Sequence, residues 1–68
     1  MPLLQATLMQ GRTQAQKEAF FEAVTQAAMQ HLDVKREQVR VMINEVPAEH
    51  WCIGGQSVAK IRSNKHQT

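Results

Sequence analysis

The chain has 68 residues, of which 43% are hydrophobic and 21% are charged, and it carries a formal net charge of +2. This composition is typical of a soluble globular domain and excludes disordered and fibrous chains, while the mild positive charge argues against a dense nucleic-acid-binding surface. No apolar run approaches the roughly 20 residues that span a bilayer, and the first residues lack the basic region of a secretory signal. We therefore expect a cytoplasmic protein with no membrane or nucleic-acid partner.

A chain of this length forms a single domain, residues 1–68, with a small core. A domain of about 60 residues buries only roughly 60% of the surface that its unfolded chain exposes. Cys52 is the single cysteine, so no disulfide can form within the chain, and an unpaired thiol favours a reducing compartment. The histidines and Cys52 are too scattered for a metal site. A ligand or self-association is therefore the expected source of additional stability.

The first half of the chain predicts a strand followed by a helix. Residues 3–9 alternate between two faces, which is the period of a β-strand. After Gly11, the pattern Thr13-x-x-Gln16 is that of a capping box, in which side chains satisfy backbone N–H groups at a helix start. Residues 13–32 then carry an apolar stripe at three- and four-residue spacing. The stripe consists of Phe20, Val24, Ala27 and His31, flanked by Phe21, Ala28 and Leu32.

The second half predicts another strand and a small hairpin. Apolar and polar residues alternate from Val39 to about Val46, and Pro47 ends the strand. A helix of about five turns between two strands is the connection expected for parallel pairing with a right-handed crossover. Residues 51–55 form a short apolar patch that ends in Gly54-Gly55, a signal for a hairpin turn. We expect the polar tail, residues 63–68, to be partly disordered or packed against another chain.

This order of elements predicts an α+β fold with a single β-α-β unit, and the unit leaves one face of its sheet uncovered. The helix can cover only one face of two strands, and the other face carries Leu3, Met9 and Met42. Parallel sheets are almost never left bare on one face. We therefore expect an oligomer in which the sheets of different chains pack on or extend one another.

Pro2 is the first candidate for chemistry. A methionine before a small residue is normally removed, and removal of Met1 would leave a proline with a secondary amine at the chain terminus. Terminal amines titrate near about pH 7.7 to 8.0, and desolvation together with a nearby cation would make such an amine a general base close to neutral pH. The alternative is that Pro2 only begins the strand, where its missing N–H has no cost.

Two arginines are candidates for binding an anion. Arg12 lies between the first strand and the helix, where the helix N-terminus also attracts anions. Arg40 lies within the second strand, and its planar guanidinium suits bidentate binding of a carboxylate. The alternative for Arg40 is a surface ion pair with Glu37 or Glu45.

Trp51 is the single tryptophan, and it has two interpretations. Aromatic residues are enriched in contacts between chains, so Trp51 could fill such a contact. Beside a pocket it would instead exclude water, which strengthens the action of a nearby amine and guanidinium.

Together these segments resemble the 4-oxalocrotonate tautomerase family. The similarity runs from Pro2 to about Ile61, and no one segment is specific alone, but their order and spacing are. The segments that carry it are Met1-Pro2, Gly11-Arg12-Thr13, Gln16-Lys17-Glu18, Leu32-Asp33, Val39-Arg40-Val41 and His50-Trp51-Cys52-Ile53-Gly54-Gly55. The resemblance implies a β-α-β fold with a C-terminal hairpin and a homo-oligomer, a hexamer arranged as a trimer of dimers. It implies neither a metal nor an organic cofactor.

The resemblance also implies a reaction and the residues that perform it. Pro2 would be the catalytic base that moves a proton between oxygen and carbon of a 2-hydroxydienoate or a similar small carboxylate. Arg12 would bind the carboxylate that is distant from the enol. Arg40, presented by an adjacent subunit, would bind the 2-hydroxy or keto oxygen with its neighbouring carboxylate and so stabilise the charge of the dienolate.

The same resemblance places three apolar residues beside the substrate. Trp51 stands where the family has a phenylalanine that makes the site apolar, and Leu3 and Met9 align with residues of the pocket wall. Trp51 is bulkier than phenylalanine, and Cys52 replaces a glycine that is usual at the entry of the hairpin. The preferred substrate can therefore differ from that of the best-known members.

Two other functions stay open beside enol-to-keto tautomerisation. A hydrolytic dehalogenase of the same superfamily would need a carboxylate that activates water, and Glu45 and Glu49 are the acids close to Trp51 in sequence. A non-enzymatic, basic oligomeric module would bind nucleic acid or a protein through its Lys and Arg side chains, with a strong dependence on salt.

Overall fold

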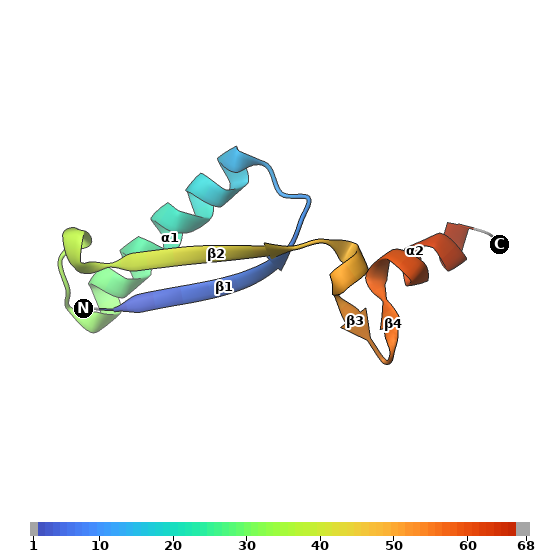
Figure 1. Cartoon of the computed structure of the whole chain (residues 1–68). Helices are drawn as coiled ribbons and strands as arrows, with labels where there is room; N and C mark the ends of the chain where they lie inside the picture. The colour runs from blue at the N-terminus through green and yellow to red at the C-terminus, as the bar shows by residue number, and fades with distance from the viewer. Residues whose placement is uncertain (1, 67–68) are drawn as a thin grey trace.

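The computed structural model describes residues 2–66 of the chain. Its elements, drawn in Figure 1, are strand β1 (Leu3–Met9), helix α1 (Gln14–Leu32), the 3-10 turn η1 (Arg36–Gln38), strand β2 (Arg40–Val46), the 3-10 turn η2 (Ala48–His50), hairpin strands β3 (Cys52–Ile53) and β4 (Gln56–Ser57), and helix α2 (Val58–His66). The predicted order of strand, long helix, strand and hairpin is confirmed. Helix α2 is an element that the sequence pattern does not predict.

β1 and β2 form a two-stranded parallel sheet, as predicted. The seven residues of β1 lie opposite the seven of β2, from Leu3 against Arg40 to Met9 against Val46. β1 has the predicted bounds, whereas β2 begins one residue after the predicted Val39. The N–H of Val39 donates to a carbonyl of η1 at 3.2 Å, so this residue closes the turn instead of joining the ladder.

Helix α1 is defined at both ends by local interactions. The N–H of Gln16 donates to Oγ1 of Thr13 at 3.1 Å, and the N–H of Thr13 donates to Oε1 of Gln16 at 2.9 Å. These two bonds are the predicted capping box. At the other end Asp33 adopts a left-handed conformation, with φ 55°, and ends the helix.

Helix α1 covers one face of the sheet (Figure 1). The half-buried strand residues on this face are Leu4, Ala6, Leu8, Val41 and Ile43. From α1, Phe21 and Val24 are half-buried, and Ala28 is buried with 5% of its surface exposed. The predicted stripe is wrong at four positions, because the face turned to the sheet runs through Phe21, Val24 and Ala28. The exposed members of the stripe are Phe20, Ala27, His31 and Leu32.

The opposite face of the sheet is open in the single chain. Leu3 is 55% exposed and Met42 is 48% exposed on this face. Burial of apolar surface contributes roughly 25 cal/mol per Å². The open face therefore favours a second layer supplied by another chain, as the sequence analysis predicts.

β3, β4 and α2 form an arm that extends from the end of β2 (Figure 1). The chain measures 51 × 24 × 15 Å and its radius of gyration is 16.2 Å, whereas a compact domain of this length has about 11 Å. Val58 is buried, with 7% exposed, but Ile53 in the hairpin is 59% exposed. The arm thus presents apolar surface that its own chain does not cover.

The polar tail predicted at residues 63–68 is in part helical. α2 includes residues 63–66, which corrects the expectation of partial disorder there, and residues 67–68 lie outside the described residues. The N–H of Lys60 donates to Oγ of Ser57 at 3.1 Å, so Ser57 caps the start of α2. The helix has few apolar residues, and therefore the sequence carries little helical periodicity here.

Candidate active site

The N-terminal end of the sheet holds Pro2, Leu3 and Arg40. Pro2 directly precedes β1 and is half-buried, and its carbonyl accepts a hydrogen bond from the backbone N–H of Arg40 at 3.0 Å. Arg40 and Leu3 are cross-strand partners, so their side chains share the open face of the sheet. Backbone pairing therefore fixes these three residues at one corner of the fold.

Among the described residues, one hydrogen bond holds the guanidinium of Arg40. Its Nη1 donates to the backbone carbonyl oxygen of Glu37 at 2.7 Å. The ion pair with Glu37 or Glu45 that the sequence left open is not formed, and Glu45 is instead bound to Lys17 at 2.9 Å. An arginine has five N–H donors, so the exposed Arg40 side chain retains donors for a carboxylate.

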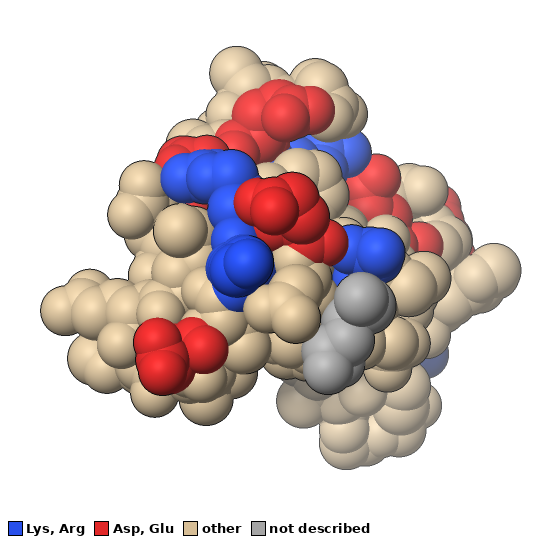
Figure 2. All heavy atoms as spheres, turned by 90° about the vertical axis from the view of Figure 1, so that its left-hand side faces the viewer, with Lys and Arg blue, Asp and Glu red and all other residues tan. Residues whose placement is uncertain are grey.

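Basic and acidic side chains lie next to one another on this end of the molecule (Figure 2). Glu22 accepts two hydrogen bonds from Arg36, at 2.9 and 3.0 Å, and one from Gln26 at 2.8 Å. The hydrogen bond from Arg36 is the main reason that the pKa of Glu22 is lowered from 4.5 to about 2, and the same contact raises the pKa of Arg36. Arg36 is thus paired with α1, whereas Arg40 has no ion pair within the described residues.

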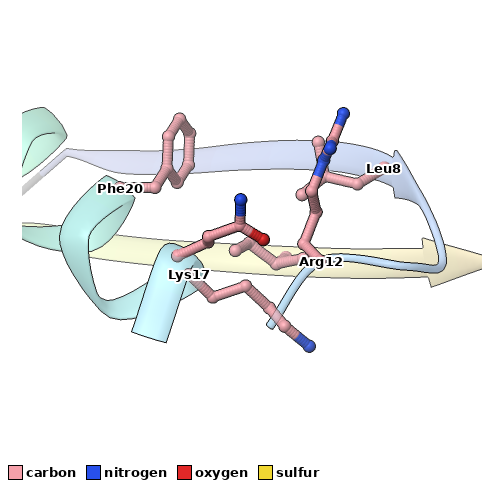
Figure 3. A pocket seen from close by; sticks show the side chains of 6 residues that line it. Leu8, Arg12, Lys17 and Phe20 are labelled. Carbon is pink, nitrogen blue, oxygen red and sulfur yellow. The ribbon is translucent and has the colours of Figure 1, made fainter. Parts of the chain in front are cut away.

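Arg12 lies at the opposite end of the sheet, in the turn between β1 and α1. Gly11 before it has a φ of 133°, a conformation that favours glycine. Arg12 is exposed and borders a hollow of about 290 Å³. The residues that line this hollow are Leu8, Arg12, Gln16, Lys17, Phe20 and Ile43. Figure 3 shows the head groups of Arg12 and Lys17 pointing in opposite directions from it.

A second hollow, of about 370 Å³, joins the turn to helix α2. It is lined by Met9, Gln10, Gly11, Arg12 and Arg62. The hollow places Arg62 near Arg12, and Arg62 is not among the site residues predicted from the sequence. Ser57 is the sequence signal that would have indicated this neighbour. A helix cap at Ser57 predicts α2, and Arg62 lies on that helix.

Strand β1 separates the two groups of candidate residues. Seven residues at a rise of about 3.3 Å span roughly 23 Å. Pro2, Leu3 and Arg40 lie at one end of this strand, and Met9 and Arg12 lie at the other. The single chain therefore brings Pro2 and Arg40 together, and it keeps Pro2 apart from Arg12.

Trp51 lies between η2 and β3, where the arm leaves β2. Trp51 is half-buried. Its backbone N–H donates to the carbonyl of Ala48 at 3.4 Å, and its backbone carbonyl accepts from the N–H of Val58 at 2.7 Å. Trp51 is thus at the end of the sheet that holds Arg12, and it lines neither of the two hollows described above.

Within residues 2–66, no three His, Cys, Asp or Glu side chains converge as metal ligands. Neither described helix combines the length and the hydropathy that crossing a membrane requires.

Residues 2–61 match the family described as tautomerase enzyme. The chain belongs to the tautomerase family. It is 52% identical over 62 residues to a probable tautomerase of Ralstonia nicotianae, which covers 88% of this chain and 89% of that relative. It is 42% identical over 62 residues to a 2-hydroxymuconate tautomerase of Pseudomonas sp. strain CF600, and this match covers 91% of this chain and 98% of that relative.

A solved structure has the same fold as this tautomerase. It is a heterohexamer 4-oxalocrotonate tautomerase from Chloroflexus aurantiacus J-10-fl, with a TM-score of 0.84, 42% identity, and coverage of 91% of this chain and 100% of that chain. The resemblance found in the sequence is confirmed, and this tautomerase is an isomerase whose structural neighbours are oligomers.

Proposed function

We propose that, after removal of Met1, this tautomerase converts 2-hydroxymuconate or a closely similar dicarboxylate enol into its keto form, with Pro2 as the general base. One observation carries the proposal: Pro2 and Arg12 lie at opposite ends of the seven-residue β1. A site that uses both must therefore combine two chains. The 42% identity with a 2-hydroxymuconate tautomerase supports this choice of substrate.

The outer edge of β1 suggests how two chains combine. Within the described residues β1 pairs only with β2, which leaves its other edge for a second copy. Antiparallel pairing of two β1 strands about Ala6 would set Pro2 of one chain opposite Gln10 of the other. The same register sets Leu3 opposite Met9. It thus gathers the base, Arg12 and both candidate wall residues, and the two-fold symmetry makes two such sites.

Pro2 moves one proton in the proposed reaction. Its nitrogen takes the proton of the 2-hydroxyl group, and the electron pair moves through the conjugated carbons as the oxygen becomes a carbonyl. The protonated proline then returns the proton to carbon, so no other reactant is consumed. A nearby guanidinium and a dry wall both disfavour the protonated amine before substrate binds.

The other candidates bind and polarise the substrate. Arg12 binds the carboxylate distant from the enol, and Arg40 from an adjacent subunit binds the 2-hydroxy oxygen and its neighbouring carboxylate. Leu3, Met9 and Trp51 form the apolar wall that keeps water out. The exposure of both guanidinium groups and of Leu3 in the single chain supports these roles.

We also propose a homohexamer built from three such dimers. The open sheet face and the extended arm support it, because both hold apolar surface that a single chain leaves exposed. The structural neighbour from Chloroflexus aurantiacus is a heterohexamer, so a second type of chain is the alternative composition. The unpaired Cys52 supports a cytoplasmic location.

Subunit mixing tests the shared site. Pro2→Ala and Arg12→Ala chains are expected to be nearly inactive separately on 2-hydroxymuconate. A mixed dimer has one site with both native residues, so dissociation and joint reassembly in equal amounts should restore about a quarter of the wild-type rate. Mixing without dissociation is the control. No recovery after reassembly would show that one chain supplies both residues or that one of them is not used.

The source of Arg40 is tested by a second mixture, of Pro2→Ala and Arg40→Ala chains. Recovery of activity supports an Arg40 from an adjacent subunit, whereas no recovery assigns Arg40 to the same chain as Pro2. The dehalogenase alternative loses Glu45, which is bound to Lys17, and leaves the exposed Glu49 of η2 as the acid that would activate water. Release of halide from a haloacrylate would support the dehalogenase alternative.

A further inference from the structure

The backbone on both sides of Arg12 is anchored by a circuit of bonds between β1, α1 and β2. On its N-terminal side the backbone N–H of Gln10 donates to the carbonyl of Val46 at 3.0 Å. On its C-terminal side the capping box of Thr13 begins α1. Lys17, one turn into the helix, closes the circuit because its Nζ lies 2.9 Å from Oε1 of Glu45, the neighbour of Val46 in β2.

The ion pair of Lys17 and Glu45 differs from the other ion pair of the described residues. Its side chains are 18% and 30% exposed, whereas those of Arg36 and Glu22 are 49% and 54% exposed. Exposed pairs contribute little because solvent and salt screen them, and partial burial reduces that screening. Lys17 and Glu45 are therefore the less exposed pair, and this pair connects α1 to β2 at the Arg12 end.

Residues 11–13 belong to no helix or strand, and Gly11 has a φ of 133°. Within the described residues no hydrogen bond holds the Arg12 side chain, so its position follows from the backbone on either side. Lys17 is not a second ligand beside it, because the two head groups point in opposite directions (Figure 3).

We propose that the Lys17–Glu45 pair positions Arg12 for the distal carboxylate, and so sets the preference of the enzyme for dicarboxylate over monocarboxylate enols. This inference rests on the proposed role of Arg12. Lys17 and Glu45 act through the turn and do not contact the substrate. Displacement of a binding group by about 1 Å is enough to weaken a bidentate contact substantially.

The test compares two substrates that differ by one carboxylate, 2-hydroxymuconate and 2-hydroxypenta-2,4-dienoate. In Lys17→Met/Glu45→Gln, which leaves the net charge unchanged, the ratio of kcat/KM for the dicarboxylate to that for the monocarboxylate should fall about three- to tenfold. The change should lie in KM for the dicarboxylate. Lys17→Gln/Glu45→Gln retains an amide hydrogen bond, so it should fold readily and give a smaller fall in the same ratio.

Two further variants separate positioning from general stability. Glu22→Gln removes the other ion pair and should leave the ratio unchanged. In an Arg12→Ala background, loss of the Lys17–Glu45 pair should cause no further fall in the ratio, because it acts through Arg12.

An equal effect on both substrates, or full additivity with Arg12→Ala, would overturn the inference. If Arg12→Ala itself leaves the ratio unchanged, the proposed role of Arg12 is what fails.

Discussion

The β-α-β unit and the C-terminal arm are held together in different ways. The unit, residues 2–46, has a seven-residue ladder, a capping box and two ion pairs between its elements. The arm has a hairpin of two residues on each strand and a backbone bond from Val58 to Trp51 at 2.7 Å. Among the residues whose burial is described, each region nonetheless has one buried apolar residue, Ala28 in the unit and Val58 in the arm.

The difference indicates where each region gains its stability. The interactions of the unit lie within one chain, so we expect the unit to keep its fold before another chain covers its open face. The arm leaves Ile53 59% exposed and points away from the unit (Figure 1). If the arm docks on another chain, as proposed, damage to the arm should affect assembly before it affects the unit.

The largest effect is expected from Val58→Asp. An unpaired carboxylate at a buried position costs on the order of 3 kcal/mol or more. The arm should detach, the oligomer should dissociate and tautomerase activity should be lost, while the circular dichroism of α1 is largely kept. Light scattering coupled to size exclusion measures the mass.

Ile53→Asp sharpens the same test, because Ile53 is exposed in the single chain and its replacement leaves the arm itself intact. Dissociation of Ile53→Asp would support docking of the arm on a neighbour, and an unchanged mass would contradict it.

A smaller effect is expected from Thr13→Ala, which removes the capping box of the unit. Loss of a helix cap costs about 1 kcal/mol. Urea unfolding should show this loss per chain, with the mass of the oligomer at a fixed protein concentration unchanged. A change of mass instead would mean that the unit, too, depends on its partners for shape.

The smallest effect is expected from Glu22→Gln, and it depends on pH. The pKa of Glu22 is about 2 in the folded chain against 4.5 for the free group, so its contribution to stability is complete above about pH 4.5 and disappears as the pH falls toward 2. Wild type should therefore lose more stability than Glu22→Gln between about pH 5 and pH 2. Urea midpoints across this range measure the difference, and parallel curves would contradict the prediction.

Much of the β-α-β unit is predictable because its signals are local. The alternation of residues 3–9, Gly11 and the Thr13 capping box each specify a conformation within a few residues. The burial of the helix was less predictable: His31 fits the apolar spacing but is exposed, because the orientation of α1 follows from the whole sheet.

The arm and the site were harder to predict for physical reasons. Helix α2 has little apolar periodicity, so its cap at Ser57 is its main signal, and Arg62 was missed with it. Pro2, Arg12 and Arg40 could be chosen as candidates by residue type and by family resemblance. Pro2 and Arg12 lie at opposite ends of β1, and how they join in one site is not predictable, because a single sequence does not state which chains lie against one another.

The length of β1 has a consequence for how this enzyme can vary. Deletion of one residue from residues 5–8 would turn the following side chains to the opposite face, and it would also shift Arg12 by about 3.3 Å relative to Pro2. Substitution at these positions changes neither. The exposed residues of this segment, Gln5 and Thr7, are thus constrained in their number more than in their kind. We expect point changes there to be tolerated, and insertions or deletions in residues 5–8 to be rejected.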